Sequence, residues 1–203
     1  MSDLPRTRAF WEDMTVRADQ VHLGGNLHMG DAESITPTLW DYLITRFGVR
    51  SMLDVGAGEG HATQYFHRKG VTAFGIDGLE GNVRNAVFPL ALHDLTTGPF
   101  TMPVDLTLCV ELVEHVAEEY VEHVLDTLTN GRVVVMTHAL PGQSGHHHVN
   151  CKPPEYWIDH FTTRGYRVSE NNERYRALAR ADLPSSHFSR SGLVFVRIPT
   201  SDV

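Results

Sequence analysis

The chain has 203 residues, 41% of them hydrophobic, and a formal net charge of −8 at pH 7. This length and apolar content suit one domain, residues 1–203, with a full hydrophobic core. The net negative charge argues against a broad phosphate-binding surface, because nucleic-acid affinity depends on Lys and Arg side chains that neutralise phosphates. A small or uncharged substrate is therefore favoured over nucleic acid.

Two features bear on where the protein works. Cys109 and Cys151 are too few and too far apart for a disulfide framework or a Cys-rich zinc site, so they are expected to be reduced thiols. The first ten residues lack the charged-then-apolar pattern of a leader, and no apolar run approaches the roughly 18 residues of a membrane span. We expect a cytoplasmic protein with no membrane partner.

Two helices are expected before the first strand, at Pro5–Asp19 and Thr36–Phe47, with a glycine-bearing stretch at 22–31 between them. Thr36 is a candidate N-cap, and Pro37 suits the first helical position. This helical prefix, residues 1–48, could fold over a bound ligand as a lid, or could simply pack as a helix and a loop.

From residue 49 to residue 198, short apolar runs alternate with helix-like stretches. The expected strands are rich in β-branched and aromatic residues: Ser51–Val55, Thr72–Ile76, Phe88–His93, Val104–Val110, Arg132–Thr137, Tyr166–Ser169 and Leu193–Ile198. The expected helices between them are His61–Lys69, Glu80–Ala86, Leu112–Leu128 and Pro154–Thr163. The alternation predicts an α/β fold, a doubly wound and mostly parallel seven-stranded sheet with helices on both faces. The stretch 171–190 contains several arginines and either caps a substrate pocket or lies on the surface.

A glycine turn follows the first expected strand, in the sequence Leu-Asp-Val-Gly-Ala-Gly-Glu-Gly-His of residues 53–61. Glycine there lets a ligand approach the main chain closely. In a dinucleotide-binding fingerprint the third glycine falls three residues after the second, a position held here by His61, whereas the third glycine is Gly60. This spacing argues against NAD.

Acidic residues close the next two expected strands. Asp77, followed by Gly78, could accept hydrogen bonds from both hydroxyls of a ribose, or could instead be a helix N-cap. Asp94 directly follows the third expected strand, at its C-terminal edge. Because ligands of open α/β sheets bind outside the carboxyl ends of the strands, Gly56, Asp77 and Asp94 are expected to converge on one molecule.

This pattern resembles the class I S-adenosylmethionine-dependent methyltransferases over residues 49–198. Residues 53–60 are similar to their first motif, Asp77 to their ribose-binding acid, and Asp94 to the residue that faces the adenine amino group. The resemblance implies S-adenosylmethionine as cofactor and a Rossmann-like sheet of order 3-2-1-4-5-7-6 whose last strand is antiparallel. It implies these donor-binding residues: Asp54, Gly56, Ala57, Gly58, Asp77, Gly78, Asp94, Leu95 and Val110.

A candidate metal site follows the fourth expected strand. If a helix begins near Glu111, then Glu111, Glu114 and His115 lie on one face of its first turn, where they could bind one ion. Alternatively, the acids are there because helix N-termini favour negative charge. The histidine run 146–148, after the fifth strand, is expected beside them. Such a carboxylate and imidazole set suits Mn²⁺, Fe²⁺, Co²⁺ or, with water, Mg²⁺.

A narrower resemblance concerns residues 111–115, Glu-Leu-Val-Glu-His. They are similar to the Glu-x-x-Glu-His signature of the metal-dependent ubiquinone-biosynthesis O-methyltransferases and of the small-RNA 3′-terminal 2′-O-methyltransferases. In the latter, a later histidine upstream of a helix completes the metal site. The resemblance therefore implies His148 as the fourth ligand, with His147 next, although the loop sequence departs from both families.

The expected reaction is metal-assisted O-methylation of a hydroxylated small molecule or a glycan. A divalent ion on the acceptor oxygen would stabilise the developing alkoxide, which favours a vicinal diol, a catechol or a sugar. His138, at the end of the fifth strand, is the candidate general base, or else a strand-end histidine bonded to the backbone. The alternatives are 2′-O-methylation of an RNA 3′ end and a non-catalytic, donor-binding regulatory protein.

Overall fold

A computed structural model describes residues 20–24 and 28–199 of the chain. The helix expected at Pro5–Asp19 lies outside these residues, so it stays a prediction. Most of the stretch 22–31, for which the sequence favours no single role, lies within them.

One sheet organises the described residues. Its strands are β1 Ser51–Val55, β2 Thr72–Asp77, β3 Ala91–Leu92, β4 Val104–Cys109, β5 Gly131–Met136, β6 Tyr166–Val168 and β7 Leu193–Arg197. Their order is β3-β2-β1-β4-β5-β7-β6, and only β7 runs antiparallel to its neighbours. The predicted fold class, strand order and antiparallel last strand are confirmed.

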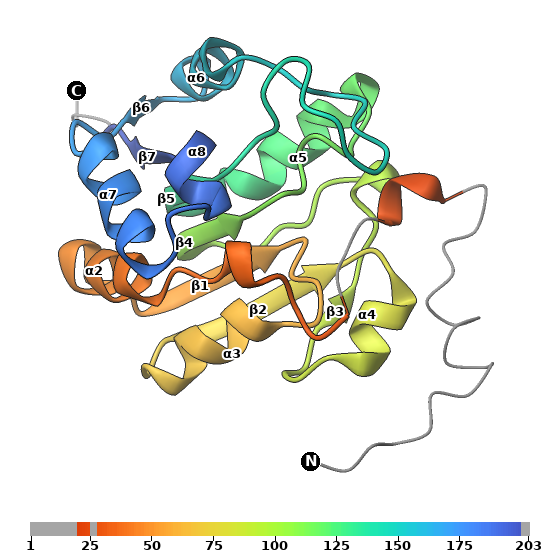
Figure 1. Ribbon diagram of the computed structural model, residues 1–203, viewed down its shortest axis with the longest axis horizontal. Helices are drawn as coiled ribbons and strands as arrows, with labels where there is room; N and C mark the ends of the chain where they lie inside the picture. Colours follow the sequence, from red (N-terminus) through yellow and green to blue (C-terminus); the bar gives the residue numbers. More distant parts are fainter. Residues whose placement is uncertain (1–19, 25–27, 200–203) are drawn as a thin grey trace.

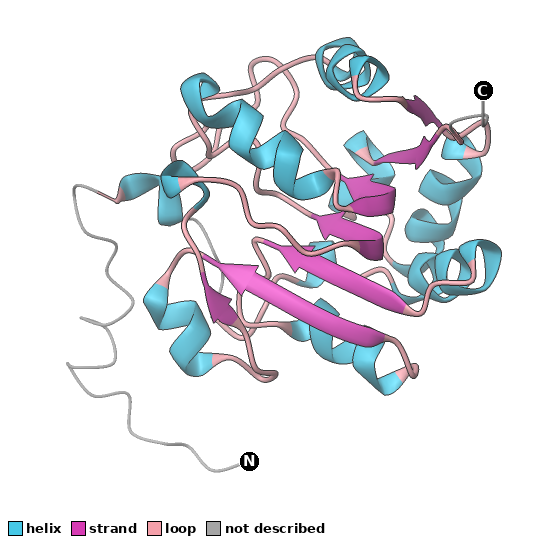
Figure 2. Ribbon diagram, turned by 180° about the vertical axis from the view of Figure 1, so that it is seen from behind, coloured by secondary structure: helices cyan, strands magenta, loops and turns pink. Residues whose placement is uncertain are grey.

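Helices cover both faces of this sheet (Figures 1 and 2). The α-helices are α2 Pro37–Phe47, α3 His61–Arg68, α4 Glu80–Asn85, α5 Val121–Leu128, α6 Pro154–Thr163, α7 Asn172–Asp182 and α8 His187–Ser191. The 3-10 turns are η1 Val21–Leu23, η2 Ala32–Ser34, η3 Leu95–Thr97 and η4 Glu118–Tyr120. None of the described helices is long and apolar enough to span a membrane.

The central strands are apolar on both sides because each side faces a separate core. In β5, Val134 and Met136 pack with α5 and α6, whereas Val133 and Val135 pack with α2, α3, α7 and α8. Such continuous apolar strands are typical of a parallel sheet between two helical layers. This packing holds the carboxyl ends of the strands in fixed positions, and the site is built there.

The edge strand β3 is shorter than expected. It pairs only at Ala91 and Leu92, instead of along Phe88–His93. Pro89 interrupts the expected strand, and proline has no N–H to give to a sheet ladder. The hydrophobic pattern alone therefore overestimated its length.

The helix expected over Leu112–Leu128 begins only at Val121, so this prediction was wrong at its N-terminal end. Residues 111–116 instead form a turn in which Glu111 has a φ of 52°, a left-handed value outside the helical region. The Glu111 N–H donates to the Thr137 hydroxyl, and that hydroxyl donates to the Glu111 carboxylate. Such side-chain bonds offer the backbone an alternative to the helix. The three residues predicted to share one helical face therefore lie in a turn instead.

Candidate active site

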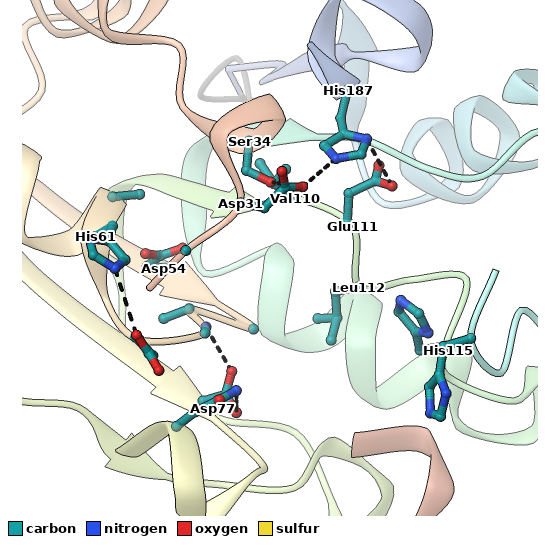
Figure 3. Close-up of a pocket in the computed structure, with 18 of the residues that line it drawn as sticks. Asp31, Ser34, Asp54, His61, Asp77, Val110, Glu111, Leu112, His115 and His187 are labelled. Atoms are coloured by element: carbon teal, nitrogen blue, oxygen red, sulfur yellow. Dashed lines mark hydrogen bonds and ion pairs between the residues drawn. The ribbon is translucent and has the colours of Figure 1, made fainter. Parts of the chain in front are cut away.

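A cavity of about 450 Å³ lies at the carboxyl ends of β1, β2 and β4. The glycine turn Gly56–Gly58 lines it together with Asp77 and Val110, and residues of the N-terminal segment line it as well (Figure 3). Its size lies in the range of small-molecule sites, roughly 300–1,000 Å³. Ligands of open α/β sheets bind at this edge.

The glycine turn leaves room for a ligand at one position. Gly56 and Gly58 both have positive φ, 73° and 56°. A side chain at Gly56 would meet Leu112, since an added Cβ lies 2.9 Å from its Cδ1 atom. At Gly58 an added Cβ would meet nothing within 4 Å. The backbone of Gly58 is therefore the part of the turn that a ligand can approach.

Asp77, at the end of β2, is hydrogen-bonded to this turn. Its Oδ2 accepts from the Gly58 N–H at 2.8 Å, and its Oδ1 accepts from the Leu79 N–H at 2.9 Å and from Asn82 Nδ2 at 3.0 Å. Burial raises the pKa of its carboxyl. The N-cap of α4 is Leu79, so the alternative of a helix N-cap does not hold for Asp77.

Asp54 connects the strand before the glycine turn to the helix after it. Its Oδ2 accepts from the backbone N–H and the hydroxyl of Thr63, at 3.1 and 2.7 Å, which ties β1 to the first turn of α3. The residue lines the cavity floor but is buried. Burial raises the pKa of the Asp54 carboxyl to about 6.

This pKa predicts a pH dependence of stability. Between the ordinary value of 3.8 and about 6, the folded state holds a proton at Asp54 that the unfolded state has lost. The free energy of unfolding should therefore fall as pH rises through this window and level off above it. Urea unfolding should show that fall in the wild type relative to Asp54→Asn. A difference between the two proteins that does not vary with pH would contradict the prediction.

Two residues expected to bind the donor lie behind the cavity wall. Asp94 caps η3 by accepting from the Thr96 N–H, and its Oδ2 lies 3.1 Å from His22 Nε2. His22 lines the cavity, whereas Asp94 and Leu95 do not. The other expected donor-binding residues do line it: Asp54, Gly56, Ala57, Gly58, Asp77, Gly78 and Val110.

The N-terminal segment supplies one wall of the cavity, as the alternative of a lid allowed, but the contacts that hold it there were not predicted. Glu59, buried at the end of the glycine turn, accepts from His28 Nδ1 at 2.6 Å and from the Met29 N–H at 2.9 Å. The next residues, Gly30 and Asp31, line the cavity. In the sequence, Glu59 is visible only as an acidic residue within the glycine turn. Nothing in that pattern identifies Met29, 30 residues earlier, as its hydrogen-bond partner.

Glu114, His115 and His148 form a candidate metal cluster. One ligand atom from each lies within 4.8 Å of the others. Glu114 is 0% exposed, and neither of its carboxylate oxygens has a hydrogen-bond partner among the described residues. The Nδ1 of His115 is also buried and, within the same part of the chain, unpartnered. Buried polar atoms are costly without a partner, and a cation would supply one.

This cluster would bind an ion with release of a proton, because a carboxylate ligand must be deprotonated. Burial, with the neighbouring negative charge of Glu111, raises the pKa of Glu114 to about 8. Burial lowers the pKa of His115 to about 4, which leaves its ring neutral and able to coordinate. One carboxylate and two imidazoles fit a divalent transition metal.

Glu111 lies outside this cluster, which contains the other three of the four predicted metal ligands. Because Glu111 leaves β4 in a left-handed conformation, its side chain points elsewhere. Its Oε2 lies 3.1 Å from His187 Nδ1, and its Oε1 accepts from Thr137 Oγ1 at 2.9 Å. His147, the second choice for the fourth ligand, is also outside the cluster.

The structure does not bring His138 to the cavity. The residue is buried, its Nδ1 lies 3.4 Å from the Ala139 carbonyl, and its ring packs beside Trp157. Burial lowers the pKa of its imidazole. These contacts fit the alternative of a strand-end histidine bonded to the backbone. The role of general base at this position has no geometric support.

No protein-family model matches the sequence, and no curated protein matches it. The fold, however, is similar to solved structures at low sequence identity. Magnesium protoporphyrin IX methyltransferase (ChlM) from Synechocystis PCC 6803 with bound SAH superposes with a TM-score of 0.60 at 14% identity, over 93% of each chain. The methyltransferase domain of bacterial CtHen1-C gives 0.57 at 13% identity, over 83% of this chain and 100% of that one.

A third structure separates fold from reaction. The [4+2]-cyclase SpnF superposes with a TM-score of 0.55 at 13% identity, over 81% of this chain and 82% of that chain. A shared fold can therefore carry a different chemistry, and function must be argued from the site. The chain has the class I S-adenosylmethionine-dependent methyltransferase fold.

Proposed function

We propose that this chain is an S-adenosylmethionine-dependent methyltransferase that methylates a hydroxyl group with the help of a divalent metal. The acceptor would be a hydroxylated small molecule or a sugar or glycan. The observation that carries the proposal is that the open glycine turn at Gly58 and the histidines His115 and His148 line one cavity. A donor site and a candidate metal site thus face the same enclosed space.

The donor would lie along the glycine turn. Gly58 leaves its backbone open to a ligand, and Asp77 stands beside it with a carboxylate suited to the ribose hydroxyls. The bound donor supplies an electrophilic methyl group on a sulfonium. The task of the cavity walls is to hold the acceptor oxygen in line with that methyl group, and alignment of this kind supplies much of the rate.

The acceptor would lie between Glu111 and the metal cluster. Glu114, His115 and His148 would hold the ion, and a bound divalent ion would supply charge stabilisation for the acceptor oxygen. Glu111 lines the cavity with an ionised carboxylate, which can accept a hydrogen bond from a hydroxyl. Together these groups favour an acceptor with two adjacent hydroxyls.

The test is methyl transfer to a panel of catechols, sugars and short RNAs, before and after a chelator. Chelation should reduce turnover at least about tenfold, and Mn²⁺, Co²⁺, Fe²⁺ or Mg²⁺ should restore it. Undiminished turnover after chelation would remove the metal from the proposal. RNA methylation that is abolished by periodate oxidation of the 3′ end would move the acceptor to RNA. SAH binding without transfer to any acceptor would favour a regulatory protein.

A further inference from the structure

Asp31, His187 and Glu111 form a bridge of side chains along one side of the cavity. Asp31 caps η2, His187 begins α8, and Glu111 follows β4, so three segments far apart in the sequence meet at one imidazole. Figure 3 shows His187 between the two carboxylates, with Asp31 and Ser34 of the η2 segment beside it. All three bridging residues line the cavity.

The imidazole uses both ring nitrogens. Its Nε2 lies 2.6 Å from Asp31 Oδ2, and its Nδ1 lies 3.1 Å from Glu111 Oε2. Ionised carboxylates can only accept, so Asp31 and Glu111 both favour the doubly protonated, positively charged ring. Burial opposes this charge, but the hydrogen bonds and charges of Glu111 and Asp31 outweigh it and raise the pKa of His187.

Arg190 lies beside both the ring and Glu33. Its Nη1 lies 3.1 Å from Glu33 Oε2, and its Nη2 lies 2.6 Å from His187 Nδ1. Arginine can only donate, so this contact favours an Nδ1 without a proton and competes with the contact of Glu111 at the same nitrogen. The side chain of His187 is only 13% exposed, so water screens the attraction of the carboxylates little.

The bridge also sets the position of Glu111. That residue has a left-handed backbone, which costs a non-glycine residue free energy and persists only when its surroundings enforce it. Thr137 holds one carboxylate oxygen and the backbone N–H, while His187 holds the other oxygen. The orientation of Glu111 in the cavity therefore depends on His187.

We propose that His187 is a positioning residue, which fastens η2 across the cavity and fixes the Glu111 carboxylate toward the acceptor. The role of Glu111 toward an acceptor rests on the proposed function, whereas the fastening of η2 does not. Without the bridge, the ties of η2 to the α8 segment would be those of Glu33, its ion pair with Arg190 and its hydrogen bond with Ser185. The enclosed donor site would then open more often.

The experiment compares His187→Gln, Asp31→Asn and the double variant with the wild type. Gln keeps a polar side chain but cannot bridge two carboxylates. SAH affinity by calorimetry should fall roughly 10- to 100-fold in each single variant, the range expected for losing hydrogen bonds to charged groups. Hydrogen exchange at residues 32–35 should become faster. Because the two residues share one bridge, the double variant should lose little more than either single variant.

The matched control is His67→Gln, an exposed histidine on α3 whose ring lies beside Phe88. It should leave SAH affinity and exchange at 32–35 unchanged. Once an acceptor is known, His187→Gln should lower kcat as well as raise the KM for the donor. A general loss of folding in His187→Gln would move the test to Asp31→Asn, which removes the same contact from the other side.

The outcomes separate this inference from the proposed function. If the wild type does not bind SAH, the proposed function fails, and hydrogen exchange at 32–35 still tests the bridge. If both single variants bind SAH as the wild type does and exchange at the wild-type rate, His187 fastens nothing and the inference is overturned. Simple additivity of the two substitutions would also overturn it, because it would show that the residues act separately.

Discussion

Replacing Gly58 with alanine should weaken SAH binding roughly 10- to 100-fold while the protein remains folded, since the new methyl group would displace donor contacts and donor–backbone hydrogen bonds. The added Cβ would meet no protein atom within 4 Å, so the protein itself has space for it. That space is the cavity, because Gly58 lines it. Isothermal titration with SAH measures the effect.

Alanine at this position also strains the backbone, and the chain offers a control for that cost. Gly48, which ends α2, has a φ of 58° and likewise no atom within 4 Å of an added Cβ, and Gly58 has a φ of 56°. Both alanine variants should lose about 1–2 kcal/mol of stability to the left-handed conformation. Gly48 does not line the cavity, so Gly48→Ala should bind SAH normally. Equal SAH binding by the two variants would place the donor away from the glycine turn.

The sheet could be predicted from the sequence because its signals are local. Each central strand is a short apolar run bounded by turn residues, and the resemblance carried by residues 53–60 implied the strand order. The spacing of Gly56, Gly58 and Gly60 alone distinguishes the turn from a dinucleotide fingerprint. Local patterns therefore sufficed for the donor half of the cavity.

The acceptor half depends on contacts that no local pattern contains. The spacing of Glu111, Glu114 and His115 fits a helical face, but Thr137 holds Glu111 in a turn from 26 residues away. His187 reaches Asp31 across 156 positions. Glu114, His115 and His148 lie together nonetheless, although not through a shared helical face. After β4, tertiary contacts therefore determine the backbone conformation, although the spacing of the residues fits a helix.

Substituting Glu114 with Gln should reduce methyl transfer at least about 100-fold, since even residues that only support metal ligands cost 10- to 100-fold when changed. The amide has the same shape but no charge to offer a cation. SAH affinity should stay at the wild-type value, because Glu114 does not line the cavity. Turnover and bound metal, measured together, check the prediction.

The stability of Glu114→Gln decides between a ligand and a structural residue. Glu114 is 0% exposed and, among the described residues, has no hydrogen-bond partner for either oxygen, so in metal-free protein its carboxyl costs stability rather than contributing it. The free energy of unfolding of chelated Glu114→Gln should therefore equal or exceed that of the chelated wild type. Glu119→Gln, at an exposed position on η4, should change neither turnover nor metal content. Loss of stability together with loss of turnover would make Glu114 a structural residue, whereas loss of turnover and metal without loss of stability requires the ion.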